Sequence, residues 1–481
     1  MRDTFEGYLA TTGTEVRQCR LPVAVRVCPL PDASGIDSAA LSSNFHQAAR
    51  AAASVIAAPH LPGLEFVLNW SGHARIFDCK APGNRLATAD GEGGHPNVND
   101  IKLSVAIPYK QRLDNLRLVF EALANQTMDS DEFEVVVGAM EYCDQYVAAC
   151  REFTDRINIV SVLSAAPFDI PRARNLAMRQ AKGRVVVQMD ADTLLPANAL
   201  RNLWDRHFAF GQKVCVVGQV VGYGNNNDGD VDEVELLPHQ AYVPVLDELT
   251  ATVDNPRDPR FQVDHVIPWA FAWTGLIALP MVTVRTHQLY FDENFHGWGV
   301  DDLEWGYRIC ASGTPIILCR DVYALHLPHV RNQAANRRTE QANYRRFLRK
   351  WPRVDVELAY AFGDMEANSL YSDFMAQLRT ACGCARATLG TVRGPVGAQD
   401  VLVVGALINP QHRLLDPKLD ARFDDRSRVE VNPLVGLALP YPDHSVDRCE
   451  VLPSVSSFSA LYRDAIDAEV QRVSRESPDG S

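Results

Sequence analysis

Short apolar runs alternate with longer amphipathic segments over residues 99–355. Each apolar run is about as long as one buried strand, and each amphipathic segment has the spacing of a helix. The runs lie at 102–110, 133–140, 156–163 and 184–190, and the helical segments lie at 113–126, 171–183 and 195–208. Strands that alternate with helices of about 10–15 residues indicate βαβ units. The pattern therefore predicts an α/β fold with a mostly parallel central sheet.

The two flanks show weaker patterns of the same kind. The first 98 residues hold strand-like runs around an alanine-rich helix and end in a linker rich in glycine, asparagine and aspartate. These runs are 22–30, 64–70 and 74–80, the helix is 39–58, and the linker is 89–100. The last segment has one clear strand at 400–407. We therefore predict an N-terminal accessory α/β region at 1–98, a main domain at 99–355 and a C-terminal accessory region at 356–481.

Composition excludes some classes of protein. The 481 residues are 47% hydrophobic and 22% charged, with a net charge of −13, so wholesale nucleic-acid binding is not expected. The start of the chain has acidic residues and no apolar core of a secretion signal. The uncharged run 267–284 contains two prolines and Gly275, which favours buried strands and loops near a site over a membrane span. The cysteines, 11 in number, form no CxxC pairs, which suits a reducing, cytoplasmic setting.

Two carboxylates follow the strand at 184–190. Asp190 and Asp192 stand two residues apart at the strand end, where the chain turns and can aim both side chains into one crevice. Two such charges about 4 Å apart repel by roughly 4 kcal/mol at an effective dielectric near 20. A divalent cation would offset this repulsion. The alternative interpretation is that Asp192 caps the helix that follows.

A second pair of carboxylates follows a Gly-Trp-Gly turn in the stretch FHGWGVDDLEWGYRI, residues 295–309. Asp301 and Glu304 have the spacing of a helix capping box, and Leu303, Tyr307 and Cys310 would form one buried helical face. This interpretation leaves Asp302 and Trp298 without a role, so both are candidate functional residues. For Trp298, core packing is the alternative.

Three motifs carry a resemblance to a known family. Residues 103–127 resemble the opening strand and helix of family 2 glycosyltransferases of the GT-A fold, and IPYKQRLDNL is similar to the opening of β-1,4-galactosyltransferases. PRARNLAMRQAKGRVVVQMDAD resembles the family 2 block that ends in a DxD motif. FDENFHGWGVDDLEWGYRI resembles the GWGxED motif of galactosyltransferases and of bacterial chondroitin-type polymerases. The resemblance implies a metal-dependent transferase that uses a nucleotide-sugar donor, most commonly UDP-linked.

The resemblance also implies roles for individual residues. Donor-binding residues would be Pro108, Tyr109, Arg112, Arg174, Asp190 and Asp192. Asp190, Asp192 and a later histidine, His326 or alternatively His329, would hold Mn²⁺ or Mg²⁺ on the diphosphate. Asp302 would be the general base, next to Asp301 in place of the usual glutamate. Trp298 would stack on a sugar ring. Gly275 would belong to the same acceptor-binding or sugar-binding site.

Some positions depart from the family pattern. The second strand usually ends in an acidic pair that contacts the base, but here it has Gly138 and Ala139. The contact is therefore lost or moved to Glu141 or Asp144, which leaves the preference for uracil open. Asp302 stands where retaining relatives with a WGGEN motif have asparagine, and this favours inversion.

Other segments have less specific features. VLVVGA and LALPYPDHSVDRCEVL in the C-terminal segment resemble pieces of a class I methyltransferase, but the glycine-rich turn is missing, so we expect a degenerate module. The basic run 331–353 is either a phosphate-facing or acceptor-facing surface or a solvated helix face.

The sequence thus predicts an inverting glycosyltransferase, with two rivals. A nucleotidyltransferase would need a glycine-rich first loop, which PYKQRLDN lacks, and a non-catalytic sugar-nucleotide-binding protein would not need the retained carboxylates. The galactosyltransferase-type motif favours galactose or N-acetylgalactosamine as the sugar. A carbohydrate, a natural product and a peptide all remain open as the acceptor.

Overall fold

The structure is a computed structural model, and it describes most of the chain from residue 101 onward. The described residues are 64–69, 73–78, 101–141, 143–164, 166–222, 231, 233–250, 257–383 and 386–475. The predicted strand at 22–30, helix at 39–58 and linker at 89–100 lie outside this set, whereas the predicted strands at 64–70 and 74–80 correspond to β1 (Leu64–Asn69) and β2 (His73–Asp78).

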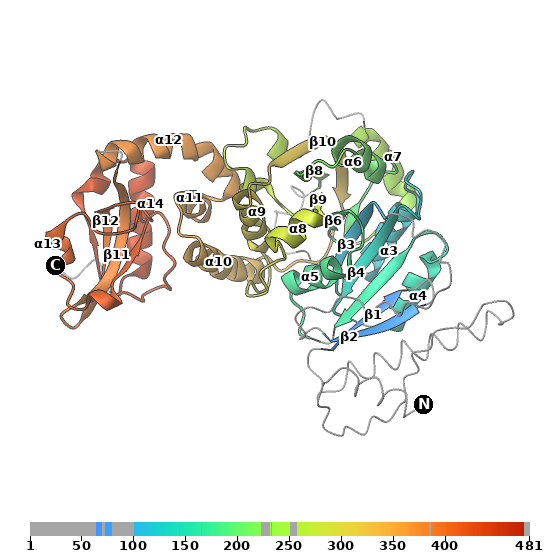
Figure 1. The fold of residues 1–481 in the computed structure, drawn as a ribbon, viewed down its shortest axis with the longest axis horizontal. Coiled ribbons are helices and arrows are strands. Elements are labelled where there is room, and N and C mark those ends of the chain that lie inside the picture. The colour runs from blue at the N-terminus through green and yellow to red at the C-terminus, as the bar shows by residue number, and fades with distance from the viewer. Residues whose placement is uncertain are drawn as a thin grey trace, which may run out of the picture. The chain divides into compact units, whose positions relative to one another are not determined.

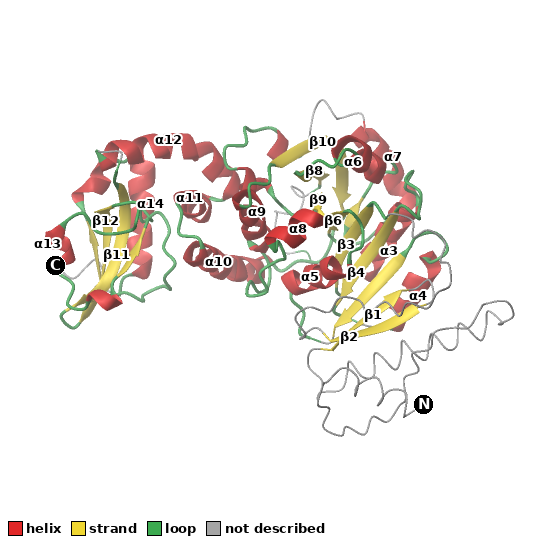
Figure 2. Cartoon of the chain, viewed as in Figure 1, coloured by secondary structure: helices red, strands yellow, loops and turns green. Residues whose placement is uncertain are grey.

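The chain divides into two compact units, each built from separate stretches. The first unit comprises 1–255, 274–293 and 319–330, and the second comprises 256–273, 294–318 and 331–481. Figure 1 traces the chain by residue number, and Figure 2 shows the helices and strands of each unit. The functional division predicted at residues 98 and 355 stays a prediction.

The first unit contains a sheet of ten described strands in the order β2-β1-β5-β4-β3-β6-β9-β8-β10-β7. The strands not yet defined are β3 (Leu103–Tyr109), β4 (Phe133–Ala139), β5 (Ile159–Ser164), β6 (Val185–Met189), β7 (Thr193–Leu194), β8 (Cys215–Val221), β9 (Leu276–Pro280) and β10 (Ile316–His326). Strands β3, β4, β5 and β6 are joined by parallel pairs, as predicted. The sheet as a whole is mixed rather than mostly parallel, because β1, β7, β8 and β9 join it by antiparallel pairs.

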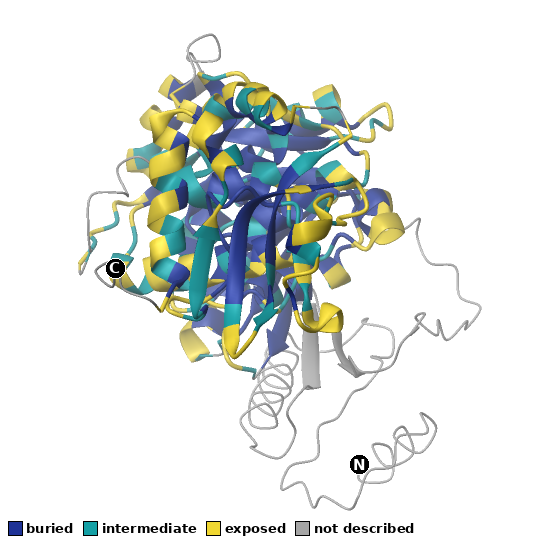
Figure 3. Cartoon of the chain, turned by 90° about the vertical axis from the view of Figure 1, so that its left-hand side faces the viewer, coloured by how far each residue is buried: buried dark blue, intermediate teal, exposed yellow. Residues whose placement is uncertain are grey.

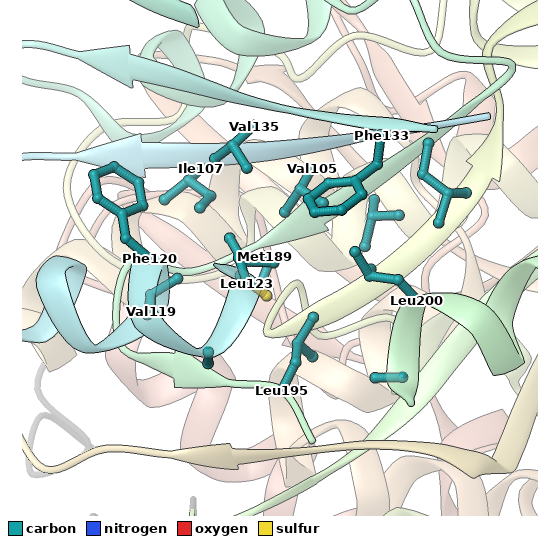
Figure 4. Packing of buried hydrophobic residues seen from close by; sticks show 14 of the residues in the cluster. Val105, Ile107, Val119, Phe120, Leu123, Phe133, Val135, Met189, Leu195 and Leu200 are labelled. Carbon is teal, nitrogen blue, oxygen red and sulfur yellow. The ribbon is translucent and has the colours of Figure 1, made fainter. Parts of the chain in front are cut away.

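Amphipathic helices pack on this sheet. They are α3 (Leu113–Ala124), α4 (Asp144–Phe153), α5 (Ile170–Gln180), α6 (Ala199–His207), α7 (His239–Thr250) and α8 (Met281–His287). In Figure 4, Val119, Phe120 and Leu123 of α3 point toward Val105 and Ile107 of β3, and all five side chains are buried. Their spacing on the helix gives one apolar face, which explains why the segment folds onto the strands.

The uncharged run 267–284 folds as three short elements. It forms η3 (Pro268–Phe271), strand β9 and the start of α8, so its prolines and glycine interrupt any long helix, as expected. Among the residues that the structure describes, no helix is long and apolar enough to cross a membrane.

The second unit combines a helical layer with a small sheet. Besides η3, its described helices are η2 (Pro259–Phe261), α9 (Asp301–Ala311), α10 (Gln333–Lys350), α11 (Val354–Phe362), α12 (Asp364–Cys382), α13 (Pro417–Asp420), η4 (Arg426–Arg428), η5 (Pro453–Ser457) and α14 (Ala460–Val473). One apolar cluster runs from Phe295 through Phe347 of α10 and Phe374 of α12 to Leu402 in the sheet, so helices and sheet share a core.

A buried carboxylate reinforces this shared core. Glu357 of α11 is fully buried, and its carboxylate accepts backbone N–H bonds from Val435 at 2.9 Å, Gly436 at 2.6 Å and Leu437 at 2.8 Å. These bonds join helix α11 to the loop between two strands of the small sheet, although nearly 80 residues separate them in the sequence.

The small sheet has the strand order β13-β11-β12-β14. Its strands are β11 (Thr388–Val396), β12 (Gln399–Ile408), β13 (Glu430–Asn432) and β14 (Arg448–Val451). The inner strands β11 and β12 carry most of the buried positions, whereas the outer strands are partly exposed; this sheet faces the viewer in Figure 3. Strands β12 and β14, which hold the two methyltransferase-like pieces, pair in parallel.

Candidate functional site

A turn after β6 places the first carboxylate pair. Strand β6 ends at Met189, the chain turns through Asp190 and Asp192, and Thr193 starts the short strand β7. Thr193 pairs with His326 of β10, and the N–H of Leu327 donates to the backbone oxygen of Asp192 at 2.7 Å. This pairing brings a histidine from a distant part of the sequence next to Asp192.

Asp192 lies between two histidines. Its Oδ1 is 3.6 Å from Nε2 of His326, and its Oδ2 is 3.7 Å from Nε2 of His329. The two rings lie 5.4 Å apart, nearly perpendicular, and the three residues can offer ligand atoms within 4.8 Å of one another. The sequence left His326 and His329 as alternatives, and the structure places both beside the same carboxylate.

Charge and burial shift the pKa values of Asp192 and His329. Burial raises the pKa of Asp192, but His326, Arg112 and His329 together hold it below its usual value. Burial and the nearby Arg112 guanidinium lower the pKa of His329 to about 4. At neutral pH the His329 ring is therefore uncharged, and one nitrogen keeps a lone pair for a metal ion.

Two arginines hold the carboxylates of the turn. The guanidinium of Arg112 forms an ion pair with Asp192, and Nη2 of Arg174 lies 3.2 Å from Oδ1 of Asp190. Arg174 is buried and also lies over the ring of Phe291. Asp190 is not part of the group formed by Asp192 and the two histidines within the described chain.

The ligand atoms of Asp192, His326 and His329 fit a divalent cation. Oδ1 of Asp192 is buried and has no hydrogen-bond partner within the described residues, so the site contains a carboxylate oxygen that a cation would satisfy. Two imidazole nitrogens and one carboxylate suit a divalent transition-metal ion better than Mg²⁺, because Mg²⁺ prefers oxygen ligands.

Other residues predicted to contact the nucleotide-sugar donor lie on β3 or follow β4. Pro108 is half-buried at the end of β3, whereas the Tyr109 ring is buried and stacks on Tyr146 at 4.7 Å between centroids. Glu141 accepts the N–H of Gln111 at 2.6 Å, in the loop that leads to Arg112. Asp144, the other substitute for the missing acidic pair, is the first residue of α4. Gly275 is buried in the turn before β9.

The second carboxylate pair belongs to the second unit. Asp301 and Asp302 begin helix α9, and Oδ1 of Asp302 accepts the N–H of Leu303 at 2.9 Å. Asp301 is buried and Trp298 is exposed. Because these residues belong to the second unit, the role of Asp302 as a base opposite the metal stays a prediction.

The predicted capping box is wrong. The residue before α9 is Val300, in a left-handed conformation with φ 72°, and no side chain caps the helix there. Glu304 is fully buried and instead forms an ion pair with Arg308 at 2.9 Å and another with Lys350 at 2.8 Å. Leu303 and Tyr307 are buried, as their spacing predicts, and Cys310 is partly buried. Asp192 does not cap the next helix either, because α6 starts after Asn198.

Two acidic residues near Asp302 were not predicted. Burial, Asp364 and Asp302 raise the pKa of Glu340, and burial raises the pKa of Asp364, which Asp302 raises further. Oδ2 of Asp364 accepts the indole N–H of Trp273 at 2.7 Å. No motif marks these residues, since they come from helices α10 and α12, after the stretch that carries the resemblance.

A second group of ligand-type side chains lies in the first unit. Nε2 of His207 is 3.1 Å from Asp321, and its Nδ1 is 3.6 Å from Sγ of Cys319. The two ring nitrogens point in different directions, so these contacts form a hydrogen-bonded chain rather than a set around one ion. Burial raises the pKa of the Cys319 thiol to about 12.

Comparison with known proteins identifies the kind of enzyme. Residues 104–253 match the family model described as glycosyl transferase family 2. The validoxylamine A glucosyltransferase of Streptomyces hygroscopicus subsp. jinggangensis (strain 5008) is 28% identical over 403 residues, which cover 77% of this chain and 95% of that protein. The chondroitin synthase of Escherichia coli is 25% identical over 232 residues, which cover 44% of this chain and 32% of that protein.

Among solved structures, that of S. aureus TarS aligns with a TM-score of 0.37 and 16% identity, over 58% of this chain and 44% of that chain. The chain is a glycosyltransferase, and the matched family model supports a family 2 domain over residues 104–253. The mixed α/β sheet of its first unit is the GT-A fold that the sequence predicts.

Proposed function

We propose that this enzyme transfers a hexose from a UDP-sugar to a hydroxyl group of a polyhydroxylated ring, with inversion and with Mn²⁺. The observation that supports this most directly is the buried Asp192 carboxylate between His326 and His329, on the turn where a GT-A sheet holds its donor. A divalent ion bound there would neutralise charge on the leaving diphosphate.

The side chains of the first unit would bind and orient the donor. Asp192, His326 and His329 would hold the metal, and Asp190 would contribute through its ion pair with Arg174. Arg112 and Arg174 place positive charge beside the carboxylates, where a diphosphate needs it. Pro108 and the backbone around Tyr109 would line the nucleotide, with Glu141 as the acidic neighbour of that loop.

Asp302 is the proposed general base. It would take the proton of the acceptor hydroxyl while that oxygen attacks the anomeric carbon from the face opposite the diphosphate. The N-terminus of α9 favours the ionised carboxylate. Trp298, exposed on the preceding turn, would stack on the acceptor ring. Asp301, buried beside it, would support the start of the helix rather than react, and Gly275 would line the sugar pocket.

Glucose is the sugar that we propose first. The validoxylamine A glucosyltransferase aligns with 77% of this chain, and its name gives glucose as the sugar and validoxylamine A as the acceptor. The galactosyltransferase-type motif favours galactose or N-acetylgalactosamine, so these are the competing donors. Cyclitol and saccharide acceptors share the ring of hydroxyl groups that Trp298 would cover.

A donor screen tests this proposal. UDP-glucose, UDP-galactose, UDP-N-acetylgalactosamine and GDP-mannose would each be incubated with Mn²⁺, Mg²⁺ or EDTA, and nucleotide release would be measured. We expect Mn²⁺-dependent release of UDP that Asp192→Asn lowers by at least about 100-fold. Asp302→Asn should keep donor binding and lose transfer by about 10²–10⁴-fold.

The same screen separates the rival functions. Formation of a nucleotide-sugar from a nucleoside triphosphate and a sugar phosphate would establish a nucleotidyltransferase instead. Donor binding without turnover, in the presence of saccharide and cyclitol acceptors, would indicate a binding protein. Normal transfer by Asp302→Asn would remove Asp302 as the base.

A further inference from the structure

The turn that carries Trp298 has an unusual backbone. Gly297, Gly299 and Val300 all have positive φ angles, of 75°, 93° and 72°. Glycine adopts such angles readily, but for a β-branched residue such as Val300 they are unfavourable. A backbone of this kind persists only when its surroundings hold it in place.

Two side chains of α10 hold this turn. The N–H of Trp298 donates to Oγ1 of Thr339 at 3.1 Å, and the Thr339 hydroxyl lies 3.0 Å from the backbone oxygen of Trp298. The side-chain amide of Asn343 donates to the backbone oxygens of His296 at 3.0 Å and Gly299 at 2.9 Å. Thr339 and Asn343 are four residues apart and therefore lie on the same face of the helix.

The fit between helix and turn is close. A Cβ atom at position 297 would lie 2.6 Å from Cγ2 of Thr339, so only glycine allows this approach. Asn343 is itself buried, and the next turn of α10 is anchored in the core by Phe347 and Leu348. The support under the turn is therefore rigid.

The turn exposes the tryptophan that it carries. Trp298 is 48% exposed, whereas Trp269 and Trp305 of the same unit are almost fully buried. Holding the backbone on both sides of an exposed indole fixes the point from which the side chain projects and leaves the ring surface open to a ligand. A residue whose backbone is held in advance loses less entropy when a ligand stacks on its ring.

We propose that Thr339 and Asn343 are positioning residues that hold Trp298 ready for the acceptor and so set the affinity for it. The inference rests on the proposed function, because it takes Trp298 as the surface on which the acceptor ring stacks. Thr339 and Asn343 act through the backbone of the turn.

Paired substitutions at Thr339 test the inference. Thr339→Val keeps the size of the side chain and removes the hydroxyl, whereas Thr339→Ser keeps the hydroxyl. We expect Thr339→Val to raise the acceptor KM about tenfold with a much smaller change in kcat and in the donor KM, and we expect Thr339→Ser to restore most of the affinity. Combining Thr339→Val with Trp298→Ala should add little to the effect of Trp298→Ala alone, because both act through the same ring.

A matched control separates this effect from a general loss of helix stability. Thr380 of α12 is exposed and donates its hydroxyl to a backbone oxygen one turn earlier, as a helical threonine commonly does, at 3.1 Å from Ala376. Thr380→Val should therefore leave the acceptor KM unchanged. Asn343→Asp, which keeps the acceptor oxygen but loses the amide donor, should raise the acceptor KM as Thr339→Val does.

The outcomes distinguish this inference from the proposed function. If the wild-type enzyme is active and Thr339→Val leaves the acceptor KM unchanged, the inference alone is overturned. It is also overturned if Thr339→Val and Thr339→Ser change the acceptor KM equally, or if turnover of the donor falls as much as the acceptor KM rises. A wild-type enzyme that turns over no donor would overturn the proposed function. In that case, titration of tryptophan fluorescence with maltose and with a cyclitol decides the inference: Trp298→Phe must abolish the binding signal and Thr339→Val must weaken it.

Discussion

The substitution Glu357→Gln is expected to destabilise the second unit because it places an N–H group against another N–H group. In the wild-type chain, Oε1 of Glu357 accepts bonds from Gly436 and Leu437, and Oε2 accepts a bond from Val435. The oxygen of a glutamine amide can accept the first two bonds. Its NH₂ group cannot accept the third, so the N–H of Val435 would lose its partner.

The expected cost follows from this count of bonds. One buried donor left without an acceptor costs about 1–3 kcal/mol. A loss near 2 kcal/mol lowers the unfolding midpoint of a unit of this size by about 4–8 °C. Glu357→Met, which leaves all three backbone donors without a partner, should cost clearly more than Glu357→Gln.

The cost should also depend on pH. Burial raises the pKa of Glu357 to about 7, although the backbone N–H groups of Val435, Gly436, Ala438 and Leu437 lower it. A carboxyl whose pKa is higher in the folded state stabilises the fold most at low pH, and this contribution is lost as the pH rises from about 4.5 to 7. At about 1.4 kcal/mol per pKa unit the loss amounts to about 3 kcal/mol. Glu357→Gln has no such group, so the substitution should destabilise the unit at pH 5, and the wild type should lose this advantage by pH 8.

Tryptophan fluorescence is a suitable measurement, because Trp269, Trp273, Trp298, Trp305 and Trp351 all belong to the second unit. Urea unfolding of both proteins at pH 5, 6, 7 and 8 would give the free energy of unfolding at each pH. A difference that grows with rising pH would refute the reasoning, because it would mean that the backbone N–H groups outweigh burial. If Glu357→Gln and the wild type have the same free energy of unfolding at every pH, the hydrogen-bond count itself would be refuted.

Three further predictions concern the first unit. Because burial lowers the pKa of His329 to about 4, its ring signals in NMR should titrate near pH 4 rather than near 6.5. Between about pH 6.5 and 4 only the unfolded chain binds the proton, so the contribution of His329 to stability should fall as the pH drops through this range. Gly138→Ala would place a Cβ atom 1.9 Å from the backbone oxygen of Ala173, and the overpacking should cost about 1–3 kcal/mol or more, seen as a lower thermal midpoint; an unchanged midpoint would disprove the contact. Burial raises the pKa of Cys150 and Cys319 to about 12, so iodoacetamide should label these thiols only after denaturation, and rapid labelling of the native protein would count against their burial.

The central strands and helices could be predicted because their signal is local. The apolar runs at 102–110 and 133–140 became β3 and β4, and the amphipathic segment at 113–126 became α3, since run length and periodicity depend only on neighbouring residues. The metal candidates Asp190, Asp192 and His326, with His329 as the alternative, came from the DxD spacing and the family resemblance. The structure places Asp192 beside both histidines, and their role as metal ligands stays a prediction.

The remaining features depend on contacts between distant segments. Strand β9 lies antiparallel between β6 and β8, and no local pattern specifies the neighbours of a strand. Glu304 has the spacing of a capping residue, yet it pairs with Lys350 from another helix. The partners of Glu357 are backbone N–H groups, which every residue except proline carries, so the sequence gives no sign of them.

The path of the chain between the two units limits how the protein can be dissected. Stretches 256–273 and 294–318 fold with the C-terminal half, whereas 274–293 and 319–330, between and after them, fold with the sheet that carries Asp192. A fragment truncated at residue 355 would keep Phe295 and Trp269 but lose Phe374 and Leu402 from their common core. Neither unit is one continuous stretch of the sequence, so the two units would have to be exchanged together in a chimaeric protein.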